Sequence, residues 1–357
     1  MSPATLLHPP PTVDSVVPER DPAGFIPHVQ ALGRGATLRR DLTRAEACDA
    51  LDRILGGSAT EAQTGAFLIA QRVKGECAAE ISGFADAVRQ RWMEPVPHSV
   101  SPLLDLAVPY DGKERTAQLV PAVALTLAAC GLPVMLHGDE QVPTKAGVTV
   151  GAVLDQLGVA IDLSPAEAGL RLEVDGVAYC SAARFMPAWH DLLPTRWEFG
   201  LRTVLNTIEK LVNPANADWQ VTGFYHTKYI DHVRAAQTGG QASWIVQGEE
   251  GSVEMRSGRK TRIYGQSADE SVVLDPAALG FAERVAVEPD PDPAAHAALN
   301  EQAVNDEDCP GRDQVALTTG VILSLFGRTA DIPSGIEAAR SALANGRASA
   351  LLESMAN

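Results

Sequence analysis

The sequence predicts an α/β protein with a small N-terminal helical domain and a larger α/β domain built on a mostly parallel sheet. Before residue 94 the apolar residues recur with helical spacing. After a proline-rich stretch at 94–102, strand-like apolar runs alternate with helical segments, the order typical of parallel sheets with crossover helices. The length of 357 residues also exceeds what most single cores contain, so we expect two domains.

We place the helical domain at residues 29–97. Thr43 is followed three residues later by Glu46, and Thr60 by Gln63; each pair forms a capping box, which marks the start of a helix. A third helix is predicted where Ile81, Phe84, Ala85 and Val88 lie on one face. Residues 1–28 are rich in proline and lack a periodic pattern, so we expect a disordered tail there.

The α/β domain is assigned to residues 98–186 and 215–357. The expected strands are 102–108, 132–138, 220–225 and 242–248, and the expected helices are 116–130, 149–158, 226–237, 312–326 and 334–345. A long helical segment at 187–214 interrupts the alternation. We expect this segment to pack away from the sheet and to complete the helical domain.

Composition restricts the possible partners. The formal net charge is -16, which repels phosphate backbones at long range, so nucleic acid could bind only at a local basic patch. No apolar run approaches the ~20 residues that a membrane-spanning helix needs. The five cysteines are widely spaced and form no C-x-x-C pair, as expected for reduced thiols. We therefore expect a cytoplasmic protein without a membrane partner.

Three segments, 42–89, 128–147 and 196–214, resemble the anthranilate phosphoribosyltransferase family (glycosyl transferase family 3) in the same order. The resemblance implies a nucleoside phosphorylase/phosphoribosyltransferase-like fold and a homodimer formed through the helical domains. It also implies transfer of ribose 5-phosphate from phosphoribosyl pyrophosphate to an aromatic amine. In the family the diphosphate lies on a glycine-rich G-T-G-G-D loop, with magnesium nearby.

Several positions depart from the family pattern. The glycine-rich loop aligns with residues 108–112, where Pro109 lacks an N–H donor and the side chains of Val108 and Tyr110 are expected to lie where a phosphate would bind. In the metal-binding D-E pair Val253 replaces the acid, which leaves Glu254 as a candidate ligand. The positions that correspond to the family's donor site are Asp111, Gly112, Thr116, His137, Gly138 and Thr144.

The first functional hypothesis is a homodimer with a degenerate donor site that binds DNA or RNA without sequence preference and requires no cofactor. It rests on resemblance to a branch of the family in which a polar, basic loop replaces the glycine-rich one. The anion-binding candidates are Lys113, Arg115, Lys145, Arg196, Arg202 and Lys210. In the alternative interpretation, the cations of 196–210 pair with Glu198 and Glu209, and Lys113 and Arg115 belong to a solvated loop.

The second hypothesis is a glycosyl or phosphoribosyl transferase with altered loop chemistry. Lys113 and Arg115 would then hold the phosphates of a sugar-phosphate donor, with Mg²⁺ as a possible cofactor and an unknown acceptor. We assign no catalytic residue. His137 is interpreted as either an acid–base catalyst or a structural residue. Glu249 and Glu250 are interpreted as a surface acidic hairpin or as magnesium ligands. A third, weaker possibility is a scaffold that binds another protein.

Overall fold

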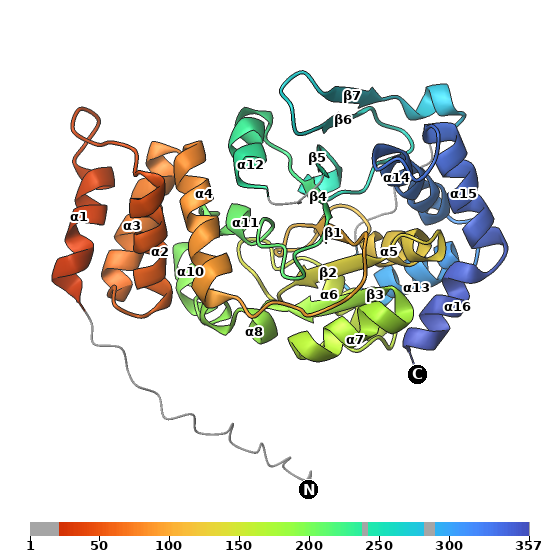
Figure 1. The fold of residues 1–357 in the computed structure, drawn as a ribbon, viewed down its shortest axis with the longest axis horizontal. Helices are drawn as coiled ribbons and strands as arrows, with labels where there is room; N and C mark the ends of the chain where they lie inside the picture. The colour runs from red at the N-terminus through yellow and green to blue at the C-terminus, as the bar shows by residue number, and fades with distance from the viewer. Residues whose placement is uncertain (1–20, 238–241, 282–289, 357) are drawn as a thin grey trace, which may run out of the picture.

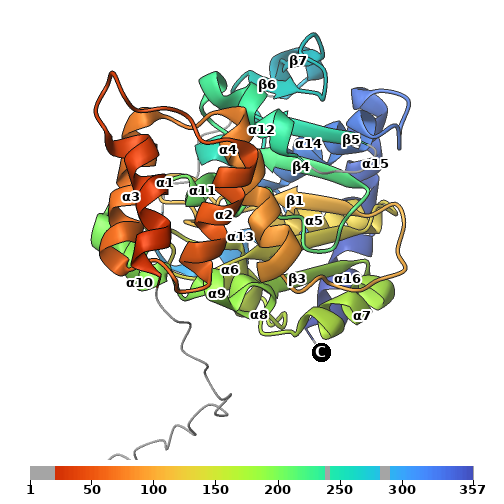
Figure 2. The same cartoon turned by 60° about the vertical axis from the view of Figure 1, so that its left-hand side comes forward.

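The computed structural model describes residues 21–237, 242–281 and 290–356 and confirms the predicted fold class. A helical domain lies at one side of the molecule (red to orange in Figure 1), and the sheet and its C-terminal helices make up the rest. In Figure 2, where this side of the molecule comes forward, its helices lie in front and to the left of the strands.

The helical domain contains the three predicted helices and one more. They are α1 (Pro22–Gly33), α2 (Arg44–Leu55), α3 (Glu61–Lys74) and α4 (Ala78–Ala87). Both predicted capping boxes are present, at Thr43 and at Thr60. Helix α1 begins inside the stretch that was expected to be a disordered tail, because Asp21 caps it and Pro22 suits its first position. The rest of that expected tail, 1–20, lies outside the described residues.

The described residues contain a seven-stranded sheet in the order β3-β2-β1-β4-β5-β6-β7. The strands are β1 (Leu104–Ala107), β2 (Val134–Gly138), β3 (Val177–Ser181), β4 (Trp219–Gly223), β5 (Ala242–Val246), β6 (Thr261–Tyr264) and β7 (Ser271–Leu274). Strands β1 to β5 are parallel, and β6 and β7 extend the edge in antiparallel pairing. The sequence predicted β1, β2, β4 and β5 but missed the other three.

Helices follow the strands of the α/β domain. They are α5 (Val120–Ala129), α6 (Val150–Gln156), α7 (Pro165–Asp175), α12 (Ile230–Ala236), α13 (Pro293–Val304), α14 (Pro310–Leu325), α15 (Ile332–Ala344) and α16 (Arg347–Met355). Helix α5 was expected from residue 116 but begins at Val120, so residues 116–119 belong to the preceding loop. Among the described residues, no helix combines the length and the apolarity needed to cross a membrane.

The two faces of the sheet belong to different cores. Leu104 and Leu106 of β1 pack in a cluster with α5 and the C-terminal helices, whereas Met135 of β2 lies in the cluster that contains the helical domain. The segment 187–214 follows α8 (Ala182–Phe185) and forms α9 (Pro187–His190), α10 (Leu193–Phe199) and α11 (Leu205–Ile208). Helix α10 contacts α3 and α11 contacts α4, so this segment lies against the helical domain.

Candidate functional site

A cleft lies at the point where successive strands are added on the opposite side of β1. From β1 the chain passes to β2 and β3 on one side, and then returns to β4 on the other side. In open α/β sheets, ligands bind outside the carboxyl ends of the two strands at this switch point. Here the loops after β1 and β4 border a cavity of about 100 Å³. Residues of several segments line it, among them Arg72, Glu76, Asp111, Arg202, Asn206, Lys210, Tyr225, His226 and Glu250.

The loop after β1 does not place Val108 or Tyr110 on its open side. Val108 and Tyr110 are each 2% exposed and point into the two cores. The hydroxyl of Tyr110 lies 2.5 Å from Nδ1 of His137. The expectation that these two side chains occupy the position of a phosphate is therefore wrong. The chain folds them into apolar clusters because burial of such side chains stabilises the protein.

His137 belongs to a buried polar row on the face of the sheet that meets the helical domain. Its Nε2 lies 2.9 Å from Oδ1 of Asp105. Oδ2 of Asp105 accepts a hydrogen bond of 2.7 Å from Gln220. Together with Tyr110, these side chains are almost completely buried. His137 therefore has no path to a ligand in the cleft, which favours the structural interpretation.

Gly112 fixes the loop against the segment that carries Thr144 and Lys145. Its φ is +70°, and a Cβ there would lie 2.5 Å from the carbonyl oxygen of Gly147, so the position needs glycine. The next residue, Lys113, exchanges two backbone hydrogen bonds with Val148, of 3.0 and 2.8 Å. Two segments that the resemblance assigned to the donor site are thus held side by side.

Lys113 does not point toward solvent. Its side chain is 2% exposed, and Nζ lies 2.7 Å from Oε1 of Glu254 and 2.9 Å from the carbonyl oxygen of Ala117. The assignment of Lys113 as a phosphate contact is therefore wrong for this conformation.

The carboxylate of Glu254 likewise contacts groups of the protein itself. It also accepts hydrogen bonds from the backbone N–H of Leu119, at 2.8 Å, and from the hydroxyl of Ser252. The ammonium of Lys113 stands where a metal ion would contact this carboxylate. The residues present therefore do not fit a magnesium ion at Glu254.

Glu250 contacts the hydrogen-bond donors of the loop after β1 that could otherwise bind an anion. Its carboxylate accepts hydrogen bonds from the backbone N–H groups of Glu114 and Arg115, at 3.3 and 2.9 Å, and from the hydroxyl of Thr116, at 3.0 Å. The ammonium of Lys145 lies 3.0 Å away. We call these four donors the anion nest.

The charge of Glu250 is firmly held in this nest. Burial alone would raise the pKa of Glu250, but the N–H of Arg115 and the ammonium of Lys145 outweigh it and lower the pKa to about 2. The side chain is 5% exposed. The surface acidic hairpin that the sequence suggested is therefore wrong for Glu250, whose side chain is buried in the site. In the sequence, Glu249 and Glu250 stand between two glycines, Gly248 and Gly251.

The remaining predicted cations do not form one open groove. Arg196 is buried 2.9 Å from Glu209, as the alternative interpretation anticipated, and Nε of Arg202 donates to Asp111 at 2.9 Å. Arg115 points outward, with 77% of its side chain exposed.

Lys210 contacts a backbone carbonyl and an aromatic ring. It donates to the carbonyl of Gly223 at 2.8 Å and lies 4.4 Å from the centre of the Phe224 ring. Burial lowers the pKa of Lys210 to about 7 and raises that of the neighbouring Glu209 to about 7.

Sequence reasoning missed the contributions of the helical domain and of the loop after β4. Arg72 and Glu76 reach the cleft from the end of α3, and His226 borders it from the other side. Burial and the nearby charge of Arg202 lower the pKa of His226. The packing of the helical domain against the sheet, together with the strand order, brings these residues together, so no local signal could have identified them.

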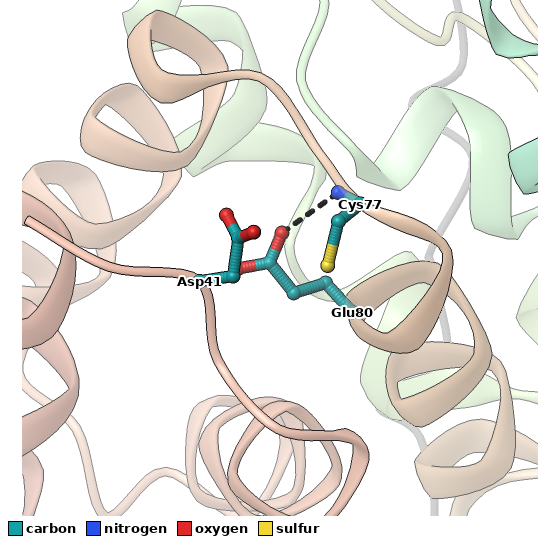
Figure 3. A group of neighbouring side chains, drawn as sticks. All are labelled: Asp41, Cys77 and Glu80. Carbon is teal, nitrogen blue, oxygen red and sulfur yellow. Dashed lines mark hydrogen bonds between the residues drawn. The ribbon is translucent and has the colours of Figure 1, made fainter.

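A second group of ligand-type atoms lies in the helical domain. One atom each of Asp41, Cys77 and Glu80 lies within 4.8 Å of the others (Figure 3). The ammonium of Lys74 lies 2.6 Å from Asp41 and 2.8 Å from Glu80. Because Lys74 already supplies the cation, we do not interpret this group as a metal site.

Comparison with known proteins agrees with the fold. Two family profiles match: "Glycosyl transferase family, helical bundle domain" over residues 27–91 and "Glycosyl transferase family, a/b domain" over residues 112–349. The anthranilate phosphoribosyltransferase of Methylocella silvestris is 32% identical over 330 residues, which cover 91% of this chain and 93% of that protein.

Solved structures give the same result. The anthranilate phosphoribosyltransferase of Thermus thermophilus has a TM-score of 0.80 at 28% identity, covering 93% of this chain and 98% of its own. The enzyme of Saccharomyces cerevisiae, solved in complex with PRPP and Mg, has a TM-score of 0.80 at 20% identity, over 93% of this chain and 97% of its own. The second likeness concerns the fold alone.

Proposed function

The chain belongs to glycosyl transferase family 3, and we propose that it is a phosphoribosyltransferase-type enzyme that holds its sugar-phosphate donor by altered loop chemistry. The observation that carries the proposal is the cleft at the switch point of the sheet, bordered by the anion nest. In this position a small ligand would contact both domains, and its phosphate would face the donors after β1.

The part of the proposed site that would hold the sugar phosphate differs from a glycine-rich loop in its hydrogen-bond donors. The N–H groups of Glu114 and Arg115, the hydroxyl of Thr116 and the ammonium of Lys145 already surround one carboxylate. Such a set can equally surround the oxygens of a phosphate, since charge-assisted hydrogen bonds offset its desolvation. The loss of glycines other than Gly112 therefore does not remove the capacity to bind an anion.

The acceptor end is the cavity between the domains. Phe224, Tyr225 and Tyr229 line it with rings, and Arg72 adds positive charge, whereas Arg202 is paired with Asp111. These groups suit a flat aromatic acceptor that carries an acid group. In the transfer, a bond forms between the acceptor nitrogen and the sugar carbon, the bond from that carbon to the diphosphate breaks, and the acceptor loses a proton.

The nucleic-acid hypothesis is less well supported. Of its six cations, Lys113 and Arg196 are buried against carboxylates, and Arg202 is paired with Asp111. Because these cations are paired with carboxylates, they produce little positive potential at the surface. The formal net charge of -16 also repels a phosphate backbone. The relatives named above are anthranilate phosphoribosyltransferases. The hypothesis stays a prediction that the same experiment tests.

Isothermal titration calorimetry with phosphoribosyl pyrophosphate, with and without Mg²⁺, tests the proposal. We expect binding with a Kd between about 1 µM and 1 mM, the range typical of enzyme substrates. Lys145→Ala should weaken binding about tenfold or more, because it removes the only ammonium of the nest. Arg115→Ala is the matched control, since its exposed guanidinium adds little.

Two outcomes contradict the proposal. One is the absence of any heat with the donor. The other is an equal loss of affinity in both variants. If the donor does not bind but DNA or RNA shows a mobility shift that disappears at high salt, the nucleic-acid hypothesis is favoured instead.

A further inference from the structure

Glu250 closes the anion nest with the chain's own carboxylate. Each of its oxygens is used: Oε1 accepts from Arg115 N–H and the Thr116 hydroxyl, and Oε2 accepts from Glu114 N–H and Lys145. The nest therefore binds one negatively charged group at hydrogen-bond distance in this conformation. A ligand phosphate cannot use these donors while the carboxylate remains.

The backbone at Glu250 is in an unfavourable conformation. Its φ is 52° and its ψ is 21°, inside a short turn at Glu249–Gly251. For a residue other than glycine, this left-handed conformation is unfavourable, and it persists only where surrounding contacts hold it. The contacts to the nest are the ones that hold Glu250. If another anion replaced the carboxylate, the turn would lose the interactions that keep it in place.

The carboxylate also lies at the border between the nest and the cleft. Glu250 and Gly251 both line the cavity, together with Pro109 and Tyr225. A movement of the turn would therefore join the nest to the cavity where the rest of a donor would lie. The small size of the cavity, about 100 Å³, also suggests that the donor needs this additional space.

We propose that Glu250 is a displaceable internal anion, and that a phosphate or diphosphate group enters the nest only after the Glu250 side chain has left. The chemical reason is charge. A phosphate brings up to two negative charges to the same donors and repels the carboxylate, so both cannot share one ammonium. The inference rests on the proposed function for the identity of the ligand, but its geometry is independent of any transfer reaction.

Calorimetric titration of the full-length protein with inorganic pyrophosphate, and separately with inorganic phosphate, tests this inference. Glu250→Ala should bind pyrophosphate at least tenfold more tightly than the parent protein, because no internal anion competes. Glu250→Gln should show a smaller gain, since the amide lacks the charge but can still contact the donors. Adding Lys145→Ala to Glu250→Ala should remove the gain.

Glu249→Gln is the matched control. Glu249 lies in the same turn, but among the described residues its carboxylate pairs with Arg256, 4.0 Å away, and not with the donors of the nest. This variant should bind pyrophosphate within about twofold of the parent. An equal gain in Glu249→Gln would show that general removal of negative charge, and not release of the nest, explains the effect.

Hydrogen exchange of the amides of Glu114 and Arg115 gives a second readout. These amides should exchange faster in Glu250→Ala and become protected again when pyrophosphate is added. Unchanged or weaker pyrophosphate binding in both Glu250 variants would overturn the inference and make Glu250 a structural cap. If Glu250→Ala unfolds, Glu250→Gln decides alone. A gain in pyrophosphate affinity without any transfer activity would leave the inference standing and contradict only the proposed function.

Discussion

At the scale of single residues, charged side chains of the site satisfy one another inside the protein. Lys113 with Glu254 and Arg196 with Glu209 are buried pairs. The partners of the first pair lie far apart in the sequence, and those of the second lie in one segment, 196–214. Such pairs add little net stability compared with apolar residues, but loss of one partner leaves a buried charge. They therefore fix the shape of the site more than they strengthen the fold.

Glu140 provides a test of a buried carboxylate whose hydrogen-bond donor is a neutral hydroxyl. Burial raises the pKa of Glu140 to about 7, with Asp139 and Asp155 adding to the shift, although Thr149 donates to it at 2.8 Å. A raised folded-state pKa gives stability that is present below the unfolded value, about 4.5, and is lost as the pH rises to about 7. Glu140→Gln removes this dependence.

We predict that Glu140→Gln equals the parent protein in stability near pH 4.5 and exceeds it by up to about 3 kcal/mol at pH 8. Urea unfolding at both pH values measures the difference. Glu167→Gln is a control in which the change in stability at high pH should have the opposite sign, because the hydrogen bonds of Ser164 lower the pKa of Glu167. It should be less stable than the parent at pH 8. A pH-independent difference for Glu140→Gln would contradict the pKa shift.

The direction of a side chain in an irregular loop could not be predicted from the sequence. In a strand, alternation shows which residues face the core, but after Ala107 the chain leaves β1 and no period applies. For this reason the sequence suggested that Tyr110 blocks a phosphate, whereas it contacts His137 in the core. The partner of Lys113 could not be predicted either, because Glu254 approaches it only through the strand order.

At the scale of elements, local signals identified helices well and edge strands poorly. The capping boxes at Thr43 and Thr60 are contacts over three residues, so the sequence contains all that they need. Strand β3 was missed because it follows α7 after a single glycine, Gly176, without a turn to separate them. Strands β6 and β7 were missed because they lie at the edge and carry exposed residues such as Val273.

Close packing of α2 and α4 explains the glycine in the middle of α4. A Cβ on Gly83 would lie 2.2 Å from the backbone oxygen of Arg44, which cannot rotate away. We predict that Gly83→Ala lowers the free energy of unfolding by about 1 to 3 kcal/mol, because the helices must separate. Thermal and urea denaturation measure this change.

Gly33→Ala is the matched control in the same domain. Gly33 ends α1, and a Cβ there would have no atom within 4 Å. Alanine in that helical position should leave stability unchanged or raise it by up to about 1 kcal/mol. An equal loss in both variants would show that the backbone conformation of glycine, and not the approach of α2, determines the result.

At the scale of the whole molecule, the site depends on both domains. The helical domain contributes Arg72 and Glu76 to the cleft, and the loops after β1, β4 and β5 and the segment 202–210 contribute the rest of the border. One core cluster contains residues of both domains, including Phe84 and Met135. The sequence could predict the two domains from their different periodicities, but not the cleft between them, since that depends on the order of the strands.

An exposed apolar face of the helical domain leads to a prediction about dimer formation. Val73 on α3 is 72% exposed and borders an apolar groove with Leu32, Ala66 and Ile69. The family resemblance implies a homodimer through this domain, and a second copy would cover the groove and bury apolar surface. We predict that Val73→Asp shifts the protein from dimer to monomer, because dimerisation would bury an unpaired carboxylate.

Size-exclusion chromatography with light scattering at several concentrations measures this shift. Val174→Asp is the matched control: it makes the same substitution at a residue that is 78% exposed on α7, in the other domain. It should remain dimeric, because α7 lies outside the groove. A monomeric parent protein, or a Val73→Asp variant as dimeric as the control, would contradict the assignment of this face. In a dimer that forms through α1 and α3, each cleft borders the end of α3 through Arg72, so the monomeric variant should also show an altered donor affinity.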